Sequence, residues 1–157
     1  MDPGECYRFV HDAAMSLRAW CSRKLAGNDI GRNVRIALHA YIDLTNPHGV
    51  HVGDGTLIET GAVVLAHDPM RHFHTNTYVG RNCFIGMQAL IAPGVKIGDQ
   101  SIILPGAVVK SDVPPGSIVV GNPARIVRSC IRTDKYGLLL DDGVDAWSDF
   151  ANKHPGL

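Results

Sequence analysis

The chain has 157 residues and a mass of 16.9 kDa, a length that predicts one domain and excludes two ordinary ones. Lys and Arg together number 15, as do Asp and Glu, so the formal net charge is zero, which excludes strong general attraction to nucleic acid or to acidic membranes. Apolar residues make up 45% of the sequence and charged residues 19%, which excludes a disordered composition.

Residues 1–27 are expected to form a helix that caps the rest of the domain. Asp2 suits the N-cap position, Pro3 the first helical position and Glu5 the third position after the cap. One apolar stripe follows at helical spacing and comprises Val10, Ala13, Ala14, Leu17, Cys21 and Leu25, with Trp20 at its edge. We expect this stripe to cover the open end of the structure that follows, because an uncovered end would expose apolar surface and unpaired strand groups.

The start of the sequence and its cysteines predict a cytoplasmic protein. Charged residues such as Arg8, Asp12 and Arg18 interrupt any apolar run near the N-terminus, so no signal peptide is expected. No stretch approaches the roughly 18 apolar residues that a membrane span needs. The four cysteines are Cys6, Cys21, Cys83 and Cys130. Because no two of them form a C-x-x-C pair, we expect reduced thiols rather than a zinc ribbon or a disulfide scaffold.

Between residues 28 and 128 the sequence repeats every six residues. The repeat is carried by twelve aliphatic residues, which are Ile30, Ile36, Ile42, Val52, Ile58, Val64, Val79, Ile85, Ile91, Ile97, Ile103 and Val109. Four positions after the aliphatic residue, most repeats have a small or branched residue such as Ala62, Cys83 or Ala89. A six-residue period fits neither a helix nor an alternating two-sided strand. It predicts short strands separated by bends, each turning one aliphatic side chain inward.

Three such strands close a triangular coil of 18 residues, and successive coils stack through parallel strand pairing at about 4.8 Å per coil. The small residues keep the interior narrow. Glycine often follows the aliphatic residue, as at Gly80 and Gly98, and we expect it there because bends often require a positive φ. The sequence therefore predicts an all-β fold, a parallel β-solenoid over residues 28–128.

Two interruptions break the register of the repeat. Four extra residues lie between Ile42 and Val52, and nine lie between Val64 and Val79. The second interruption predicts an inserted loop at residues 68–78. A regular solenoid gains nothing from such an excursion, so this loop is the best indication of a functional site that position alone offers.

Residues 129–157 form a short tail after the last regular repeat. The tail contains three consecutive leucines, Leu138, Leu139 and Leu140, followed by aspartates around Trp147 and Phe150. We expect it to be amphipathic and to pack either on the solenoid or on a neighbouring subunit.

Three motifs resemble those of the hexapeptide-repeat acetyltransferases. They are Ala66-His67-Asp68 before the loop, residues 84–86 with 91–99 after it, and residues 109–116 leading to Gly121-Asn122-Pro123-Ala124-Arg125. The resemblance covers about residues 28–128 and is closest to galactoside and maltose O-acetyltransferases and to acetyltransferases of polysaccharide biosynthesis. It implies a left-handed parallel β-helix, a homotrimer, and transfer from acetyl-CoA to a hydroxyl, less readily an amine, of a sugar or glycan intermediate. It implies neither a metal nor a nucleic-acid partner.

The resemblance carries the family's catalytic histidine onto His67. An imidazole titrates near neutral pH, so it can take a proton from the acceptor as the acceptor attacks the thioester, and return it to the departing thiolate. A histidine base usually needs an acceptor on its other ring nitrogen. Asp68, Glu59, Asp43 or a backbone carbonyl are the alternatives, and we place Asp68 and Glu59 with His67 in the catalytic set.

The resemblance also implies that coenzyme A lies in a groove between two parallel β-helices. Its contacts are carried onto Phe84, Gly86, Gly106, Lys110, Arg125 and Arg128. The phenylalanine is expected to contact a ring, the cations suit a polyphosphate, and backbone amides near the glycines are expected to donate to pantetheine carbonyls. The loop residues Arg71, His72 and His74 are expected to shape the acceptor pocket.

Other functions stay open. His67, His72 and His74 crowd one loop, and histidine is a good zinc ligand, so a metal site similar to that of the gamma-class carbonic anhydrases is the main alternative. A serine acetyltransferase-like activity and a trimeric scaffold without catalysis are two more. A nucleophilic Cys83 is not favoured, because its place in the repeat predicts a buried and inert thiol.

Overall fold

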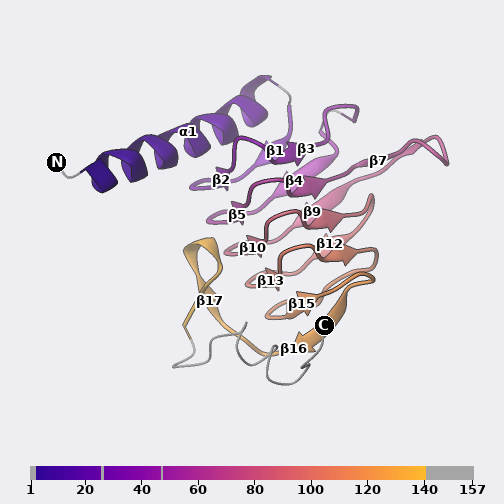
Figure 1. Cartoon of the computed structure of the whole chain (residues 1–157). Helices are drawn as coiled ribbons and strands as arrows, with labels where there is room; N and C mark the ends of the chain where they lie inside the picture. The colour runs from indigo at the N-terminus through magenta and orange to yellow at the C-terminus, as the bar shows by residue number, and fades with distance from the viewer. Residues whose placement is uncertain (1–2, 26, 47, 141–157) are drawn as a thin grey trace.

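The computed structural model describes residues 3–25, 27–46 and 48–140, and shows a three-sided β-solenoid with a helix lying across one end (Figure 1). Two expectations, the helix N-cap at Asp2 and the acidic stretch after residue 140, lie outside the described residues. No helix in the described part is long and apolar enough to cross a membrane.

The chain begins with α1 (Pro3–Leu25) and then winds through three sheets, one on each side of a prism. Sheet A consists of β1 (Asp29–Ile30), β4 (Val50–Val52), β9 (Thr77–Val79) and β12 (Lys96–Ile97). Sheet B consists of β2 (Arg35–Ile36), β5 (Leu57–Ile58), β10 (Phe84–Ile85), β13 (Ile102–Ile103), β15 (Ile118–Val120) and β16 (Arg125–Arg128). Sheet C consists of β3 (Tyr41–Ile42), β6 (Val63–Val64), β11 (Leu90–Ile91) and β14 (Val108–Val109). Strands pair in parallel within these sheets, apart from β15 with β16, so the fold is a parallel β-helix, as expected.

The pairing register confirms the 18-residue coil and both interruptions. Ile85 pairs with Ile103, 18 residues later, and with Ile58, 27 residues earlier, so the intervening coil carries nine extra residues. Ile36 pairs with Ile58, 22 residues later, which places four extra residues in the first coil. Both insertions leave the prism at the same corner, where sheet C gives way to sheet A.

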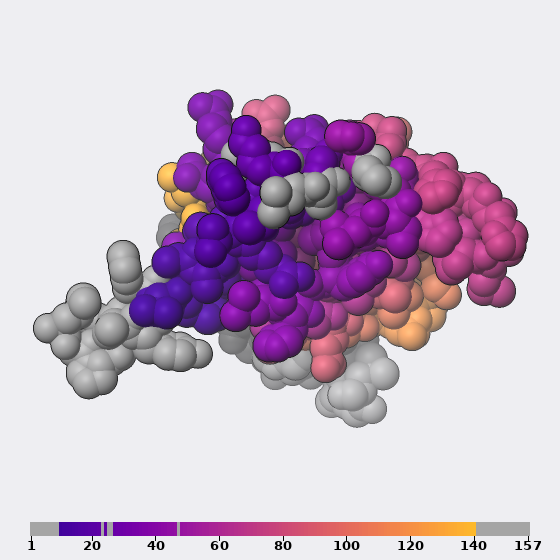
Figure 2. Space-filling view, turned by 90° about the horizontal axis from the view of Figure 1, so that it is seen from above, coloured from indigo at the N-terminus to yellow at the C-terminus, as the bar shows by residue number. Residues whose placement is uncertain are grey.

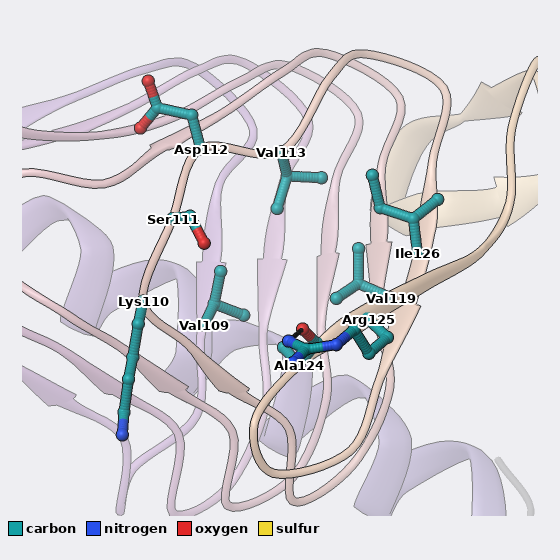
Figure 3. A pocket seen from close by; sticks show the side chains of 9 residues that line it. All are labelled: Val109, Lys110, Ser111, Asp112, Val113, Val119, Ala124, Arg125 and Ile126. Carbon is teal, nitrogen blue, oxygen red and sulfur yellow. Dashed lines mark hydrogen bonds between the residues drawn. The ribbon is translucent and has the colours of Figure 1, made fainter.

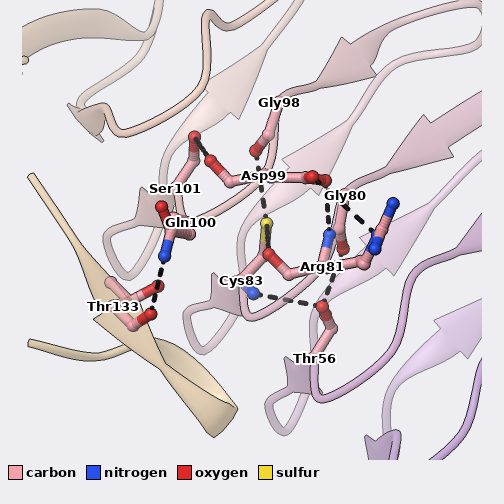
Figure 4. A network of polar contacts seen from close by, with 9 residues as sticks. All are labelled: Thr56, Gly80, Arg81, Cys83, Gly98, Asp99, Gln100, Ser101 and Thr133. Atoms are coloured by element: carbon pink, nitrogen blue, oxygen red, sulfur yellow. Dashed lines mark hydrogen bonds and ion pairs between the residues drawn. The ribbon is translucent and has the colours of Figure 1, made fainter. Parts of the chain in front are cut away.

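The interior holds one aliphatic and one small side chain per repeat. All twelve aliphatic residues of the repeat are at most 5% exposed. Three of the small positions are polar and donate to a backbone carbonyl of the next coil. Thr56 and Cys83 do so at 2.8 and 3.3 Å (Figure 4), and Ser101 donates to the carbonyl of Pro114 at 3.1 Å. Full burial of each large aliphatic side chain stabilises the fold by about 1.5–3 kcal/mol. The narrow interior is therefore both apolar and internally hydrogen-bonded.

The glycines that follow the aliphatic residues have a different role from the one expected. Positive φ occurs three positions after the aliphatic residue, as at Asn82 (52°) and Gln100 (59°), and not at Gly80 or Gly98. A Cβ at Gly98 would lie 2.4 Å from the backbone nitrogen of Pro115 in the next coil. The expectation of positive φ was wrong, because these glycines are required by the close stacking of coils.

Helix α1 lies against β1 and β2 of the first coil, but not through the predicted stripe. Met15 and Ala19 are 2% and 3% exposed, whereas Leu17 and Trp20 are 60% and 51% exposed. Arg18 donates to two backbone carbonyls of the first coil. The predicted packing face was therefore wrong. The helix approaches the first coil through Met15 and the small residue Ala19, and hydrogen bonds from Arg18 fix its position.

Residues 129–140 return along the outer face of sheet B and form a strap across the coils (Figure 1). The strap contains β17 (Thr133–Asp134), the 3-10 turn η1 (Lys135–Gly137) and β18 (Leu138–Leu139). The Thr133 carbonyl accepts from the Gln100 side chain at 3.0 Å (Figure 4). The Thr133 hydroxyl donates to the carbonyl of Asn82 at 2.6 Å. The Tyr136 N–H donates to a carbonyl of the second coil at 2.6 Å. The described part of the tail therefore packs on its own solenoid.

We predict that Ile85→Ala lowers the free energy of unfolding by about 2–5 kcal/mol, because Ile85 is fully buried and the coil cannot close over the cavity. Ile126→Ala is the matched control: Ile126 is 46% exposed, and its loss should stay below about 1 kcal/mol. Denaturant unfolding measures both values, and equal losses would contradict this account of the core.

Candidate active site

The nine-residue insertion forms a hairpin that carries two stacked histidines. Strand β7 (His67–Asp68) pairs antiparallel with β8 (Phe73–His74), which places His67 opposite His74. Their ring centroids are 4.9 Å apart, and the ring planes differ by 25°. The hairpin projects from the prism, as both views show (Figures 1 and 2). His67 is half-buried at its root.

Asp43 follows strand β3 of the first coil, next to the point where the hairpin leaves the second coil, and its charge interacts with that of His67. The side chain is 1% exposed, and its carboxylate accepts hydrogen bonds from the Thr45 N–H at 2.9 Å, the Thr45 hydroxyl at 2.6 Å and the Ala66 N–H at 2.9 Å. Burial acts to raise the pKa of Asp43, but the hydrogen bonds and the attraction to His67 outweigh it and hold the pKa below its usual value. Asp43 is therefore ionised at neutral pH and bound to the peptide group that precedes His67.

The other two predicted carboxylates serve local turns. The Asp68 carboxylate accepts from the backbone N–H groups of Met70 and Arg71 at 2.9 and 3.2 Å and lies 3.7 Å from the Arg71 Nε. Glu59 accepts from the N–H of Thr60, its neighbour, at the corner between sheets B and C. Of the three carboxylates, Asp43 is the one that binds the backbone N–H of Ala66, the residue before His67, and Asp68 closes the hairpin turn.

The tip of the hairpin presents polar and apolar side chains to solvent. Arg71 and His72 are exposed, His72 adopts a positive φ of 51°, and Met70 is 90% exposed. Within residues 3–25, 27–46 and 48–140, no three His, Cys, Asp or Glu side chains come together as a possible metal site.

Two of the predicted coenzyme residues line one pocket. Lys110 and Arg125 border a pocket of about 260 Å³, with Asp112 as its acidic neighbour (Figure 3). Lys110 directly follows β14 just as Leu65 follows β6, so it lies at the corner of the prism from which the hairpin leaves. Two coils separate these positions, about 10 Å along the axis. Lys110 and the root of the hairpin therefore lie along one edge, whereas the pocket itself opens at the end of the last coil, where Val109, Val113 and Val119 line it.

The glycines predicted to contact pantetheine use their amides within the solenoid. The Gly86 N–H donates to the carbonyl of Ile103, and the Gly106 N–H to the carbonyl of Met87, both at 2.8 Å. These two N–H groups are therefore engaged within the solenoid, and a contact between the coenzyme and the amides near them stays a prediction. They lie at the corner between sheets B and C, where coil stacking requires those bonds.

Phe84 lies on the outer face of sheet B, which is the side of the prism opposite the hairpin corner. It packs against Ile102 and Ile118 beneath the strap, and a Cβ at Gly137 would lie 2.3 Å from the Phe84 Cβ. Phe84 and His67 of one chain therefore face opposite directions. A site that contains both residues requires two chains.

Arg128 lies on β16 opposite Ile118, and its Nη1 is buried without a hydrogen-bond partner among the described residues. The structure places it apart from the Lys110 pocket lining, which contains Arg125 but not Arg128.

Cys83 is confirmed as an unreactive interior thiol. The side chain is fully buried, and its Sγ contacts the carbonyls of Arg81 and Gly98 at 3.4 and 3.3 Å. Burial raises the pKa of Cys83 to about 11, so the thiolate that nucleophilic chemistry needs is absent at neutral pH.

Sequence reasoning missed two features of the site. It treated residues 68–78 as a loop and so did not place His74 on His67, although a hairpin turning at residues 70–71 brings these positions opposite each other. It also passed over Asn46, in the four-residue insertion, whose side chain contacts both strands of the hairpin. The sequence did carry one indication of these contacts, because the repeat places both insertions at the same corner of successive coils.

Two family models match the solenoid. Residues 76–111 match the model described as bacterial transferase hexapeptide (six repeats), and residues 27–66 match that of the hexapeptide repeat of succinyl-transferase. Together they fall on both sides of the hairpin.

Several proteins similar in sequence to this chain are named as acetyltransferases. The chain is 33% identical over 115 residues to the acetyltransferase-like protein YvoF of Bacillus subtilis. The match covers 72% of this chain and 67% of that protein. It is 29% identical over 129 residues to galactoside O-acetyltransferase of Escherichia coli, covering 74% and 64%. A solved galactoside acetyltransferase in complex with coenzyme A is 28% identical, with a TM-score of 0.51 over 63% of this chain and 53% of that one. The chain thus spans about two thirds or less of the length of these relatives.

We predict that Asp43→Asn lowers the free energy of unfolding at pH 7 by about 1–3 kcal/mol, because a buried charged acceptor of three hydrogen bonds is replaced. Since the pKa of Asp43 is lower in the folded than in the unfolded chain, its contribution is fully present above the unfolded value, near 3.8, and is lost as pH falls through the folded value. The gap between the two proteins should therefore close below pH 4. A gap that stays constant from pH 7 to pH 3 would contradict the assignment.

Proposed function

The chain belongs to the hexapeptide-repeat family of acetyltransferases, and on that basis we propose that it transfers an acetyl group from acetyl-CoA to a hydroxyl group of a sugar or glycan intermediate, with His67 as the general base. The observation that carries the proposal is the placement of the His67 imidazole at the root of the hairpin, beside a buried and ionised Asp43.

The proposed reaction passes through one ternary complex. A ring nitrogen of His67 takes the proton of the acceptor hydroxyl while the hydroxyl oxygen attacks the thioester carbonyl. The tetrahedral intermediate then collapses, the C–S bond breaks, and the imidazolium returns the same proton to the departing sulfur. The products are the acetyl ester and free coenzyme A, and no acyl-enzyme forms.

Asp43 supports this role electrostatically. Its carboxylate is ionised, and its attraction to His67 favours the imidazolium that forms during the transfer. Its hydrogen bond to the Ala66 N–H also fixes the backbone from which His67 extends. Asp68 and Glu59, the first candidates, engage local N–H groups, so we assign the electrostatic role to Asp43 instead.

Coenzyme A is proposed to lie along the edge that joins the hairpin to the Lys110 pocket. Lys110 and Arg125 would hold phosphate groups, since guanidinium and ammonium groups bind polyphosphates through charge-assisted hydrogen bonds. Arg71, His72 and His74 belong to the hairpin and are proposed to contact the acceptor. The names of the galactoside acetyltransferase relatives support a sugar hydroxyl as the acceptor.

A homotrimer is proposed because one chain offers half of this groove. The three outer faces differ: the strap covers sheet B, and sheet A presents polar residues at Asp29, His51 and Lys96. Sheet C instead presents an apolar column formed by Tyr41, Val63, Leu90 and Val108, which pair in register. An apolar sheet face is expected to pack against another chain.

His67→Ala is predicted to lower kcat at least 100-fold while acetyl-CoA binding and assembly are retained, because proton transfer by a positioned side chain contributes about 10²–10⁴-fold. The measurement is thiol release from acetyl-CoA with a panel of galactosides, maltose, nucleotide sugars and serine. His39→Ala, at the corner between sheets B and C, is the control and should keep wild-type turnover. A near-wild-type rate for His67→Ala would contradict the role of His67 as the general base. A preference for serine over every sugar of the panel would contradict the proposed sugar acceptor.

Leu90→Glu is predicted to convert the trimer into monomers, since it places a charge at the centre of the sheet C column. Analytical ultracentrifugation reads the mass, and Lys135→Glu on the exposed strap is the control that should leave the assembly intact. A Leu90→Glu trimer would show that sheet C is not the interface.

A further inference from the structure

The four-residue insertion of the first coil lies next to the hairpin of the second, on the side of the hairpin that faces helix α1 (Figure 1). Strand β3 pairs with β6, so the residues that follow these strands stack at one corner. The first insertion runs from Asp43 towards Gly49, and the second begins at Leu65. A regular solenoid needs neither insertion, yet the smaller one supports the larger.

The side chain of Asn46 bridges both strands of the hairpin at its base. Its Nδ2 donates to the carbonyl of Ala66 at 3.0 Å and to the carbonyl of Thr75 at 2.9 Å. Ala66 immediately precedes His67, and Thr75 immediately follows His74. A primary amide has two N–H donors, which suits two carbonyls.

The peptide groups around Ala66 are held from several sides. The Ala66 N–H donates to the Asp43 carboxylate at 2.9 Å, and the Ala66 carbonyl accepts from the Thr75 N–H at 3.0 Å in addition to Asn46. Ala66 is fully buried. The backbone before His67 is therefore fixed by side chains of the first coil, while the ring of His67 stays half-buried at the surface.

The local chain is shaped to house this amide. A Cβ at Gly49 would lie 2.2 Å from the Asn46 Nδ2 and 2.8 Å from the Ala66 Cβ. The Gly49 N–H in turn donates to the Asn46 carbonyl at 2.9 Å. The absence of a side chain at residue 49 therefore opens the space in which the Asn46 amide reaches the hairpin.

We propose that Asn46 is a positioning residue for His67: its amide clamps the two strands of the hairpin so that the imidazole is held at the proposed thioester site. This rests on the proposed function of His67. A misplacement of about 1 Å is enough to cost on the order of 10²-fold in rate, so a clamp at the root of a projecting hairpin has a large effect on turnover.

Asn46→Asp is the sharpest variant, because it keeps the shape of the side chain but sets carboxylate oxygens against two carbonyl oxygens. We expect kcat for acetyl-CoA with the best acceptor of the panel, or with water if no acceptor is used, to fall about 10- to 100-fold. The KM for acetyl-CoA should change less than about twofold, because the Lys110 pocket is untouched. Asn28→Asp is the control: Asn28 donates to the Ser22 hydroxyl at 3.3 Å near α1, so this variant should keep wild-type kcat whatever stability it loses.

A double-mutant cycle distinguishes positioning from a general structural role. If Asn46 acts through His67, Asn46→Asp should cause no further loss in a His67→Ala background. A loss of the same size in both backgrounds, or an unchanged kcat in the wild-type background, overturns the proposal.

Hydrogen exchange separates this proposal from the proposed function. The Thr75 N–H, which closes the hairpin on Ala66, should exchange at least about tenfold faster in Asn46→Asp than in wild type. Unchanged protection overturns the clamp even if His67 is the base. If His67→Ala turns over like wild type, the proposed base is wrong, the positioning role falls with it, and faster exchange would then leave Asn46 as a structural clamp only.

Discussion

Close parallel stacking of 18-residue coils is the constraint on which the rest of the molecule depends. Each coil contributes strand pairs to three sheets, so a coil cannot be lengthened within a side without breaking the register of its neighbours. One aliphatic and one small residue fill each side, and glycine is needed where adjacent backbones come within 3 Å of a Cβ, as at Gly98. Inserted residues can therefore be accommodated only at the corners of the prism, and a functional site can form there.

The two insertions use that constraint to build half of a site on a rigid edge. Asp43 and Asn46 of the first coil hold the peptide groups that carry His67 on the second, and Lys110 lies on the same edge below. Asp43 and Asn46 belong to an insertion that directly follows strand β3, and their hydrogen bonds to Ala66 tie the backbone before His67 to the neighbouring coil. In the proposed trimer a second chain would supply the other wall, and we assign the contact between chains to the apolar column of sheet C.

The sequence carried more of the fold than of the site. A six-residue period with buried aliphatic positions from Ile30 to Val109 has few solutions, so coil length and both insertions were predictable. The docking face of α1 was not, because helix periodicity marks an apolar stripe without saying whether anything covers Leu17. The hairpin pairing of His67 with His74 and the amide bridge of Asn46 depend on how two insertions meet across a coil. The repeat places both insertions at one corner, but it gives neither the pairing within the hairpin nor the contacts between the insertions. Phe84 is a similar case, because its place under the strap depends on a segment more than 40 residues away.

A crystal structure of the assembled protein with bound coenzyme A tests the central claim most directly. The account predicts that the thiol sulfur lies in a groove bordered by two chains, within about 3.5 Å of a His67 ring nitrogen or one water removed from it, with phosphates beside Lys110. Coenzyme bound wholly to one chain, with its thiol away from the hairpin and its ring under the strap, would contradict the account.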